Sequence, residues 1–273
     1  MTRSRTVAIA VSMLFSMASP VASAGAPSSA DPVRAATSDA TRPGNAASNA
    51  EAAVLHRVLI GRSVQGRPIW AYRKGNPQGT NTVVVVGQMH GDERAGVRTA
   101  RYIRERVPVA RNSKVWIVPT MNPDGLAADT RRNARDVDLN RNWPTRWEPG
   151  DGAGSRALSE PETRAMFRFL TRVQPRFIVS LHQPFGVVGL SDKNPRFVRR
   201  LSAELNLPVA RVQIGDCTGP DCPPVPTMTS WYNARRPGFC VTVEFPAHPT
   251  RQYLTARAGP GILRATFAWR RVR

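Results

Sequence analysis

The chain has 273 residues, a formal net charge of +20 at pH 7 and three cysteines. This length fits one large domain or two small ones. A charge of this size is compatible with nucleic-acid binding, but the basic residues are nearly all arginine, are scattered, and form no basic run or aromatic-basic repeat. We therefore expect no nucleic-acid partner.

The first 24 residues have the organisation of a secretory signal peptide. Arg3 and Arg5 precede an apolar stretch at residues 7–18, and Ala-Ser-Ala at 22–24 offers a small-x-small cleavage site. The apolar stretch is short for a membrane span, although an uncleaved anchor is the alternative. We predict a signal peptide at residues 1–24, a secreted or cell-envelope location, and no stable membrane insertion after cleavage. An exported basic protein also attracts anionic cell-wall polymers without specificity.

Residues 25–50 are rich in Ala, Ser, Pro, Asp, Thr and Asn and show no apolar periodicity, which indicates a disordered leader. Globular patterning follows, so we predict one domain over residues 51–273. Strand patterns are expected at 68–75, 82–88, 114–120, 176–182 and 239–245. Helix patterns are expected at 92–107, 159–173 and 194–205, with Ser159 and Asn194 as N-caps and broken helical signal at 254–271. This alternation predicts an α/β fold, a three-layer α/β/α sandwich around a mixed, mostly parallel sheet.

Titratable side chains collect where the apolar strands end. The valine-rich strand leads to His90 with Glu93 three residues on, the "FIVSLH" strand ends at His182, and "VTVEF" carries Glu244. Ligands of α/β sheets bind beyond the carboxyl ends of the strands. His90, Glu93 and His182 make a two-His, one-carboxylate set, which is a catalytic zinc shell with a fourth position open. The His-x-x-Glu spacing excludes the His-Glu-x-x-His helix motif. A histidine that ends a strand is, taken alone, more often a structural residue.

The ordered set "MHGDE", "TRRNARDVDLNRNWP", "SLHQ" and "VTVEFP" resembles the zinc carboxypeptidase family. The resemblance begins near "IGRSVQGRPIWAYRKG", which looks like the family's entry strands, and continues to about Phe245. It implies the family fold, a peptidase activity, a peptide substrate with a free carboxylate, and one Zn²⁺ per chain bound by His90, Glu93 and His182.

The same resemblance implies roles for five further residues. Glu244 matches the general base, and Arg131 matches the arginine that faces the scissile carbonyl. Asn140 and Arg141 match the pair that binds the terminal carboxylate, for which a planar guanidinium is suited. Asp138 matches the carboxylate that orients the first zinc histidine. Without the resemblance, Arg131 is equally consistent with a solvent-exposed arginine and Asp138 with a residue that caps a turn. Glu244 differs, because a carboxylate on an apolar strand is costly without a partner, which favours a functional site.

The cysteines mark a departure from the digestive members of the family. Cys217 and Cys222 bracket the short turn "CTGPDC" and are predicted to form a disulfide, which export permits. Cys222 falls where those enzymes have a mobile tyrosine, so the loop that closes on substrate is expected to be rebuilt. Cys240 lies in an apolar stretch and is expected to be a buried thiol. His56 and His248 are expected to be structural or surface residues.

These observations predict a secreted zinc metallocarboxypeptidase that removes a C-terminal residue from cell-wall-derived peptides. Three alternatives stay open. The first is the murein peptide amidase activity that the resemblance implies for compact bacterial members, which cut γ-D-glutamyl-diaminopimelate bonds. The second is a zinc deacylase of the aspartoacylase type. The third is a wall-binding pseudoenzyme, against which the intact ligand set and Glu244 argue.

Overall fold

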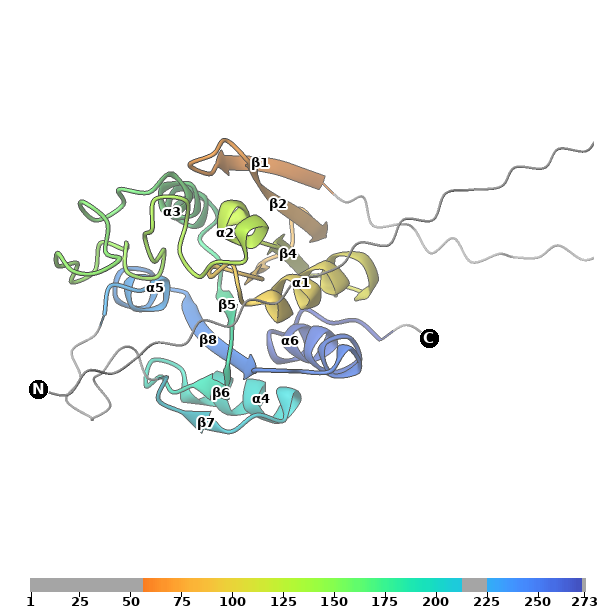
Figure 1. The fold of residues 1–273 in the computed structure, drawn as a ribbon. Coiled ribbons are helices and arrows are strands. Elements are labelled where there is room, and N and C mark those ends of the chain that lie inside the picture. The colour runs from red at the N-terminus through yellow and green to blue at the C-terminus, as the bar shows by residue number, and fades with distance from the viewer. Residues whose placement is uncertain (1–55, 213–224, 272–273) are drawn as a thin grey trace, which may run out of the picture. The chain divides into compact units, whose positions relative to one another are not determined.

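The computed structural model describes residues 56–212 and 225–271, which belong to one compact unit of the chain (Figure 1). Its strands are β1 His56–Arg62, β2 Pro68–Gly75, β3 Asn81–Val86, β4 Ser113–Val118, β5 Phe177–His182, β6 Phe185–Gly189, β7 Val209–Ala210 and β8 Phe239–Pro246. Its helices are α1 Arg94–Arg106, α2 Pro123–Ala128, α3 Pro161–Val173, α4 Pro195–Leu205, α5 Met228–Arg235, the π-helix η1 Tyr253–Ala258 and α6 Gly259–Ala265.

The strands form one sheet of eight in the order β1-β2-β4-β3-β5-β8-β6-β7. Its centre is parallel, because β3 pairs in parallel with both β4 and β5, and β5 with β8. The antiparallel pairs are β1–β2, β2–β4 and β6–β8. The predicted mixed, mostly parallel sheet is confirmed, and its parallel strands are buried on both faces, as the continuous valines of β3 require.

Two hydrophobic clusters cover the two faces of this sheet. Val83 and Val85 point into a cluster with α1, α4 and α6, whereas Val84 and Val86 point into one with α3 and α5. Figure 1 shows these two helix groups on opposite sides of β5 and β8. The α/β/α layering is therefore confirmed. None of the helices within 56–212 and 225–271 has the length and apolar character needed to cross a membrane.

Local details differ from the sequence predictions. The valine-rich strand ends at Val86, so His90 lies four residues beyond it in a loop rather than at its last position. Asn194 caps α4 by accepting a hydrogen bond from the Phe197 amide, as predicted. Ser159 does not cap α3: the N-cap position is Glu160, and the Ser159 hydroxyl instead donates to the Glu160 carboxylate. The Glu160 carboxylate is buried and therefore needs a hydrogen-bond donor.

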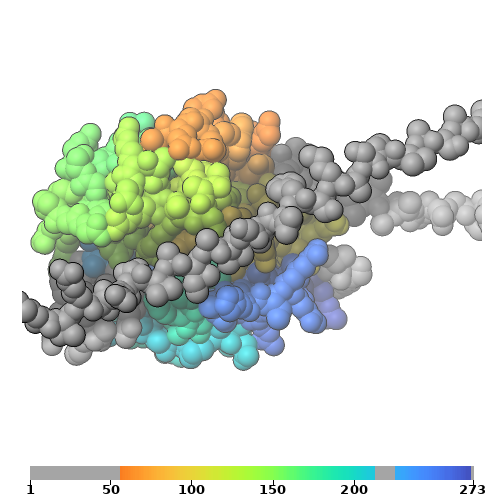
Figure 2. Space-filling model, viewed as in Figure 1, coloured from red at the N-terminus to blue at the C-terminus, as the bar shows by residue number. Residues whose placement is uncertain are grey.

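A long segment without helix or strand, residues 129–160, lies at the surface next to the N-terminal strands (Figure 2, green). Buried asparagines hold it in place. The Asn142 amide donates to the carbonyls of Ala153 and Arg156, and the Asn133 amide donates to the Glu160 carboxylate. Since buried backbone carbonyls need donors, these amides replace the hydrogen bonds that a helix or a strand would supply.

The start of α1 packs so closely against the end of β3 that no side chain fits between the two backbones. A Cβ on Gly96 would lie 1.6 Å from the Gly87 carbonyl oxygen and 3.0 Å from Leu181 Cβ. Only glycine permits this approach, which fixes the position of the loop 87–93 between the two elements.

Gly96→Ala should therefore destabilise the fold by about 1–3 kcal/mol or more, the usual range for overpacking, although alanine normally stabilises a helix relative to glycine. Urea unfolding measures the difference. Gly150→Ala is the matched control, because nothing lies within 4 Å of its added Cβ. Equal stability of the Gly96→Ala protein and the unmodified protein would show that the contact is not constraining.

Candidate metal centre

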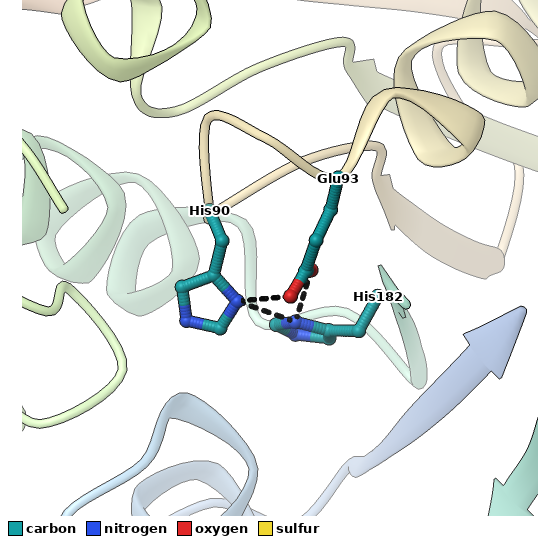
Figure 3. A group of neighbouring side chains, drawn as sticks. All are labelled: His90, Glu93 and His182. Carbon is teal, nitrogen blue, oxygen red and sulfur yellow. Dashed lines mark hydrogen bonds and ion pairs between the residues drawn. The ribbon is translucent and has the colours of Figure 1, made fainter. Parts of the chain in front are cut away.

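Three buried side chains from two elements meet at the carboxyl edge of the sheet (Figure 3). His90 and Glu93 come from the loop between β3 and α1, and His182 is the last residue of β5. His90 Nδ1 lies 2.7 Å from one Glu93 oxygen, and His182 Nδ1 lies 3.0 Å from the other. Glu93 is the N-cap of α1 but makes no capping hydrogen bond, because its carboxylate is directed at the two rings.

The outer nitrogen of each ring has a partner of its own. His90 Nε2 lies 3.1 Å from Asp138 Oδ1, and His182 Nε2 lies 3.0 Å from the hydroxyl oxygen of Ser180. A carboxylate accepts from an imidazole N–H, so Asp138 favours the His90 tautomer with hydrogen on Nε2. The inner nitrogen of His90 then presents a lone pair toward His182 and Glu93.

The charges of this group are strongly coupled. Burial disfavours the imidazolium of His90, but hydrogen bonds to Asp138 and Glu93 outweigh burial and raise its pKa to about 9. Burial likewise opposes ionisation of Glu93, but the neighbouring His182 and His90 lower the Glu93 pKa to about 2. The carboxylates therefore favour positive charge between the rings.

The donor set fits a zinc ion. The two Nδ1 atoms lie 3.3 Å apart and face each other, an arrangement in which their lone pairs repel unless a cation or proton lies between them. Two nitrogens that are each about 2.0–2.1 Å from a tetrahedral ion are separated by about 3.3–3.4 Å. His90, Glu93 and His182 could thus hold the ion through two imidazoles and one carboxylate, with Asp138 and Ser180 orienting the rings.

Glu244 lies beside this group because β5 and β8 are in parallel register, with His182 opposite Glu244. Its side chain is buried, and within the described ranges its Oε2 atom has no hydrogen-bond partner. Burial raises its pKa, an effect that the neighbouring His182 partly offsets. A buried carboxylate oxygen without a donor is costly in a purely structural role, so its position indicates a role toward a bound water or ligand.

Asp138 connects the metal-binding side chains to the predicted arginines. Its Oδ2 atom lies 3.1 Å from Nη2 of Arg131, whose Nη1 is 3.3 Å from Glu93. It also accepts a hydrogen bond from the Asn140 amide at 2.8 Å, so Asp138 caps a turn as well as contacting His90. His90 and the nearby arginine charges lower its pKa against the effect of burial. Arg131 is 45% exposed in its side chain, so it is anchored on one side and open to solvent on the other.

Asn140 and Arg141 lie next to Asp138 in the same loop. The Asn140 side-chain oxygen accepts from the Met228 amide at 3.2 Å, which links the loop to α5. The Arg141 guanidinium lies 4.0 Å from Asp138 and is 22% exposed. The structure thus brings Asn140 and Arg141 to the edge of the candidate metal centre. The Arg141 guanidinium is partly exposed, so an anion can reach it.

Sequence reasoning missed two residues of this site. Ser180 precedes His182 by two positions on β5, so strand alternation puts both on one face, and that signal was available. Gln183 bonds Ala95 and the segment after β8, and no sequence pattern marks it. Cys217 and Cys222 lie outside the described residues, so their pairing stays a prediction. Cys240 is buried as expected, and burial raises its pKa to about 12.

Comparison of the sequence with known proteins agrees with a zinc site of this kind. The family model of the zinc carboxypeptidases matches residues 45–188. The chain is 29% identical over 220 residues to murein peptide amidase A of Escherichia coli (strain K12), covering 72% of this chain and 86% of the relative. It is 33% identical over 138 residues to carboxypeptidase SOL1 of Arabidopsis thaliana, covering 45% of this chain but 28% of that protein.

Solved structures resemble the fold as well. The murein-tripeptide amidase of Escherichia coli O157 superposes with a TM-score of 0.61 at 25% identity, covering 80% of this chain and 93% of that chain. Carboxypeptidase A from Helicoverpa armigera gives a TM-score of 0.64 at 18% identity, covering 78% and 68%. At that identity the second similarity concerns the fold alone.

The purified protein should bind about one zinc ion, and His182→Ala should lose most of it because one of three donors is gone. Metal analysis after zinc loading and dialysis checks both statements. His248→Ala is the matched control, since His248 is an exposed histidine outside the donor set. Equal zinc content in the two variants would contradict this assignment of the ligands.

Proposed function

This chain belongs to the zinc carboxypeptidase family, and we propose that it is an exported enzyme that hydrolyses the peptide bond next to a free carboxylate in cell-wall-derived peptides. The proposal is carried by one observation: the buried Glu244 carboxylate, whose Oε2 has no hydrogen-bond partner among the described residues, lies in register with His182 beside His90 and Glu93. A base, a set of zinc ligands and an arginine within reach of an anion are the parts that such hydrolysis needs.

Zinc, the cofactor of this family, acidifies a bound water and polarises a carbonyl when it is present. Glu244 accepts the proton of the attacking water and passes it to the leaving amine. Its burial suits this task, because a raised carboxylate pKa brings a base closer to neutral pH, where proton transfer in both directions is efficient.

Arg131 stabilises the negative charge that develops on the carbonyl oxygen. Its guanidinium is held by Asp138 and Glu93 and therefore needs little reorganisation. Arg141 and Asn140 bind the free carboxylate of the substrate. A guanidinium donates two parallel hydrogen bonds to a carboxylate, which selects a terminal carboxylate over an amide. The burial of Arg141 strengthens that preference, since a charge shielded from water gains more from its partner.

A γ-D-glutamyl-diaminopimelate amidase is the second candidate, and a specific observation favours it. The chain matches murein peptide amidase A over 86% of that protein's length, whereas it matches carboxypeptidase SOL1 over only 28%. Both activities use the same zinc, base and carboxylate-binding residues and differ in the bond presented. The aspartoacylase-type deacylase and the pseudoenzyme are the remaining alternatives.

Export is part of the proposal. It is supported by the charged start, the apolar stretch and the small-x-small site in residues 1–24, and a cell-wall peptide would be reached outside the cytoplasm. The positive charge supports attraction to anionic wall polymers, and a disulfide between Cys217 and Cys222 would be stable in that location.

Glu244→Gln should retain zinc yet lose turnover by several orders of magnitude, because the ligands stay intact while the base is gone. Zinc content and hydrolysis of stem peptides are measured on the same sample. Glu105→Gln, a change of the same kind at an exposed position, controls for loss of charge. Near-normal turnover in zinc-loaded Glu244→Gln protein would refute the role of Glu244.

Amidation of the substrate's terminal carboxylate should lower kcat/KM by about a hundredfold or more, because each charge-assisted hydrogen bond to Arg141 is worth about 1.5–3 kcal/mol. Arg141→Lys should lose much of this discrimination, since lysine keeps the positive charge but lacks the planar guanidinium that donates two parallel hydrogen bonds to a carboxylate. Steady-state kinetics on the free and the amidated peptide with both proteins measures it. Equal rates on both peptides with the unmodified enzyme would exclude the carboxypeptidase activity and leave an endo-acting amidase or a deacylase.

A further inference from the structure

The helix α1 begins without a cap from its own N-cap side chain. The first four N–H groups of a helix have no intrahelical acceptor, and the N-cap side chain usually accepts from the second or third helical residue. The N-cap side chains of α2, α4 and α5 do accept in this way. Glu93 has the N-cap position of α1, but its carboxylate contacts His90 and His182 instead (Figure 3). The start of α1 therefore needs an acceptor from elsewhere.

Gln183 supplies this acceptor from the end of another element. Its side-chain oxygen accepts from the amide of Ala95, the second residue of α1, at 2.8 Å. Ala95 is buried, so its amide needs a partner within the protein. Gln183 directly follows His182, the last residue of β5. The residue next to one metal-binding side chain thus caps the helix that begins after another, Glu93.

The amide nitrogen of Gln183 holds the end of β8. It donates to the carbonyls of Pro246 and Ala247 at 3.2 and 2.9 Å, and Pro246 lies two residues beyond Glu244. A glutamine side chain has one acceptor oxygen and two N–H donors, so these three partners fix which way the amide points. Among residues 56–212 and 225–271, no other hydrogen bond joins α1 to β5, to β8 or to the segment after β8.

This arrangement affects the metal centre through competition for the Glu93 carboxylate. Without Gln183, the ordinary acceptor for the Ala95 amide would be the N-cap side chain, which is Glu93. A Glu93 side chain that turned toward the helix would leave His90 and His182 without their shared carboxylate. Capping by Gln183 removes this competition, so the carboxylate is available to a metal ion.

We infer that Gln183 is a positioning residue of the metal centre, which caps α1 in place of Glu93 and ties this helix to the strand that carries Glu244. Its oxygen keeps the Glu93 carboxylate on the two histidines, and its amide nitrogen holds the end of β8 in place relative to them. Gln183 acts through these residues and is not itself a metal ligand. The part of the inference that concerns Glu244 rests on the proposed function, whereas the part that concerns Glu93 is a statement about metal binding alone.

Gln183→Met keeps the length of the side chain but removes its three hydrogen bonds. It should weaken zinc binding by about tenfold or more, the usual effect of losing a group that orients a metal ligand. Competition with a chromophoric chelator measures the zinc affinity. The visible absorption spectrum of the cobalt-loaded protein should change as well, because it responds to the loss of Glu93 from the ligand set.

Asn233→Leu is the matched control. The Asn233 side chain joins α5 to Cys240, near the start of β8, by donating to its carbonyl and accepting from its amide at 2.9 and 2.8 Å. This contact lies at the opposite end of the strand from Glu244. Its loss should lower the melting temperature but leave the zinc affinity and the cobalt spectrum unchanged, which separates positioning from general destabilisation.

Gln183→Glu separates the two halves of the inference. The carboxylate keeps an acceptor for the Ala95 amide but has no donor for the two carbonyls after β8. The cobalt spectrum should therefore stay as in the unmodified protein, while kcat on stem peptides should fall by about tenfold or more, because a small displacement of a catalytic group is costly.

The outcomes also separate this inference from the proposed function. Unchanged zinc affinity and cobalt spectrum in Gln183→Met protein, or an equal loss of zinc affinity in Asn233→Leu protein, overturns the inference while a zinc peptidase remains. If Gln183→Met does not fold, Gln183→Glu decides: a normal cobalt spectrum with slowed turnover supports the inference, and unchanged turnover or a changed spectrum overturns it. If no peptide is cleaved, the proposed activity fails, and the zinc affinities and cobalt spectra, which need no substrate, decide the inference.

Discussion

The parallel pairing of β5 with its two neighbours is the constraint on which the site depends. β3 and β8 lie on either side of β5, so the segments that follow all three strands emerge at one edge of the sheet. Register then puts His182 opposite Glu244, while the close approach of α1 to β3 fixes the loop with His90 and Glu93. The strands can be this apolar because both faces are covered, and their rigidity supports charged groups that would otherwise avoid burial.

Asp138 extends this arrangement from the sheet to the substrate-binding loop. One of its oxygens contacts His90 and the Asn140 amide, and the other contacts Arg131. The carboxylate that contacts His90 thus also holds Arg131 beside the candidate metal centre. A substitution that displaces the 129–160 segment should therefore change the geometry of the metal centre, although that segment has neither helix nor strand.

Much of this was predictable from the sequence, for physical reasons that differ by element. Strand β2 was predicted to the residue and β5 to within one residue at its start, because their ends are marked by polar residues or turns and their interiors are apolar. The donor set was predictable because histidine is scarce in this chain and two of its four histidines follow apolar strands. Asn140, Arg141 and Asp138 were placed only through the resemblance, since one loop sequence does not reveal which buried groups it will meet.

Other features could not be predicted. The strands β6 and β7 and the helix α5 were not predicted, because they are only 5, 2 and 8 residues long and depend on tertiary contacts. The Ser159 cap was wrong because a buried carboxylate competed for that hydroxyl.

The central claim is that His90, Glu93 and His182 converge to hold zinc through the inner nitrogens of both rings. A crystal structure of the zinc-loaded protein, with anomalous diffraction recorded at the zinc edge, tests it most directly. We expect one anomalous peak about 2.0–2.1 Å from Nδ1 of His90 and of His182, with Glu93 as the third ligand and Asp138 still on His90 Nε2. A peak elsewhere, or coordination through Nε2 with Asp138 displaced, would contradict the account.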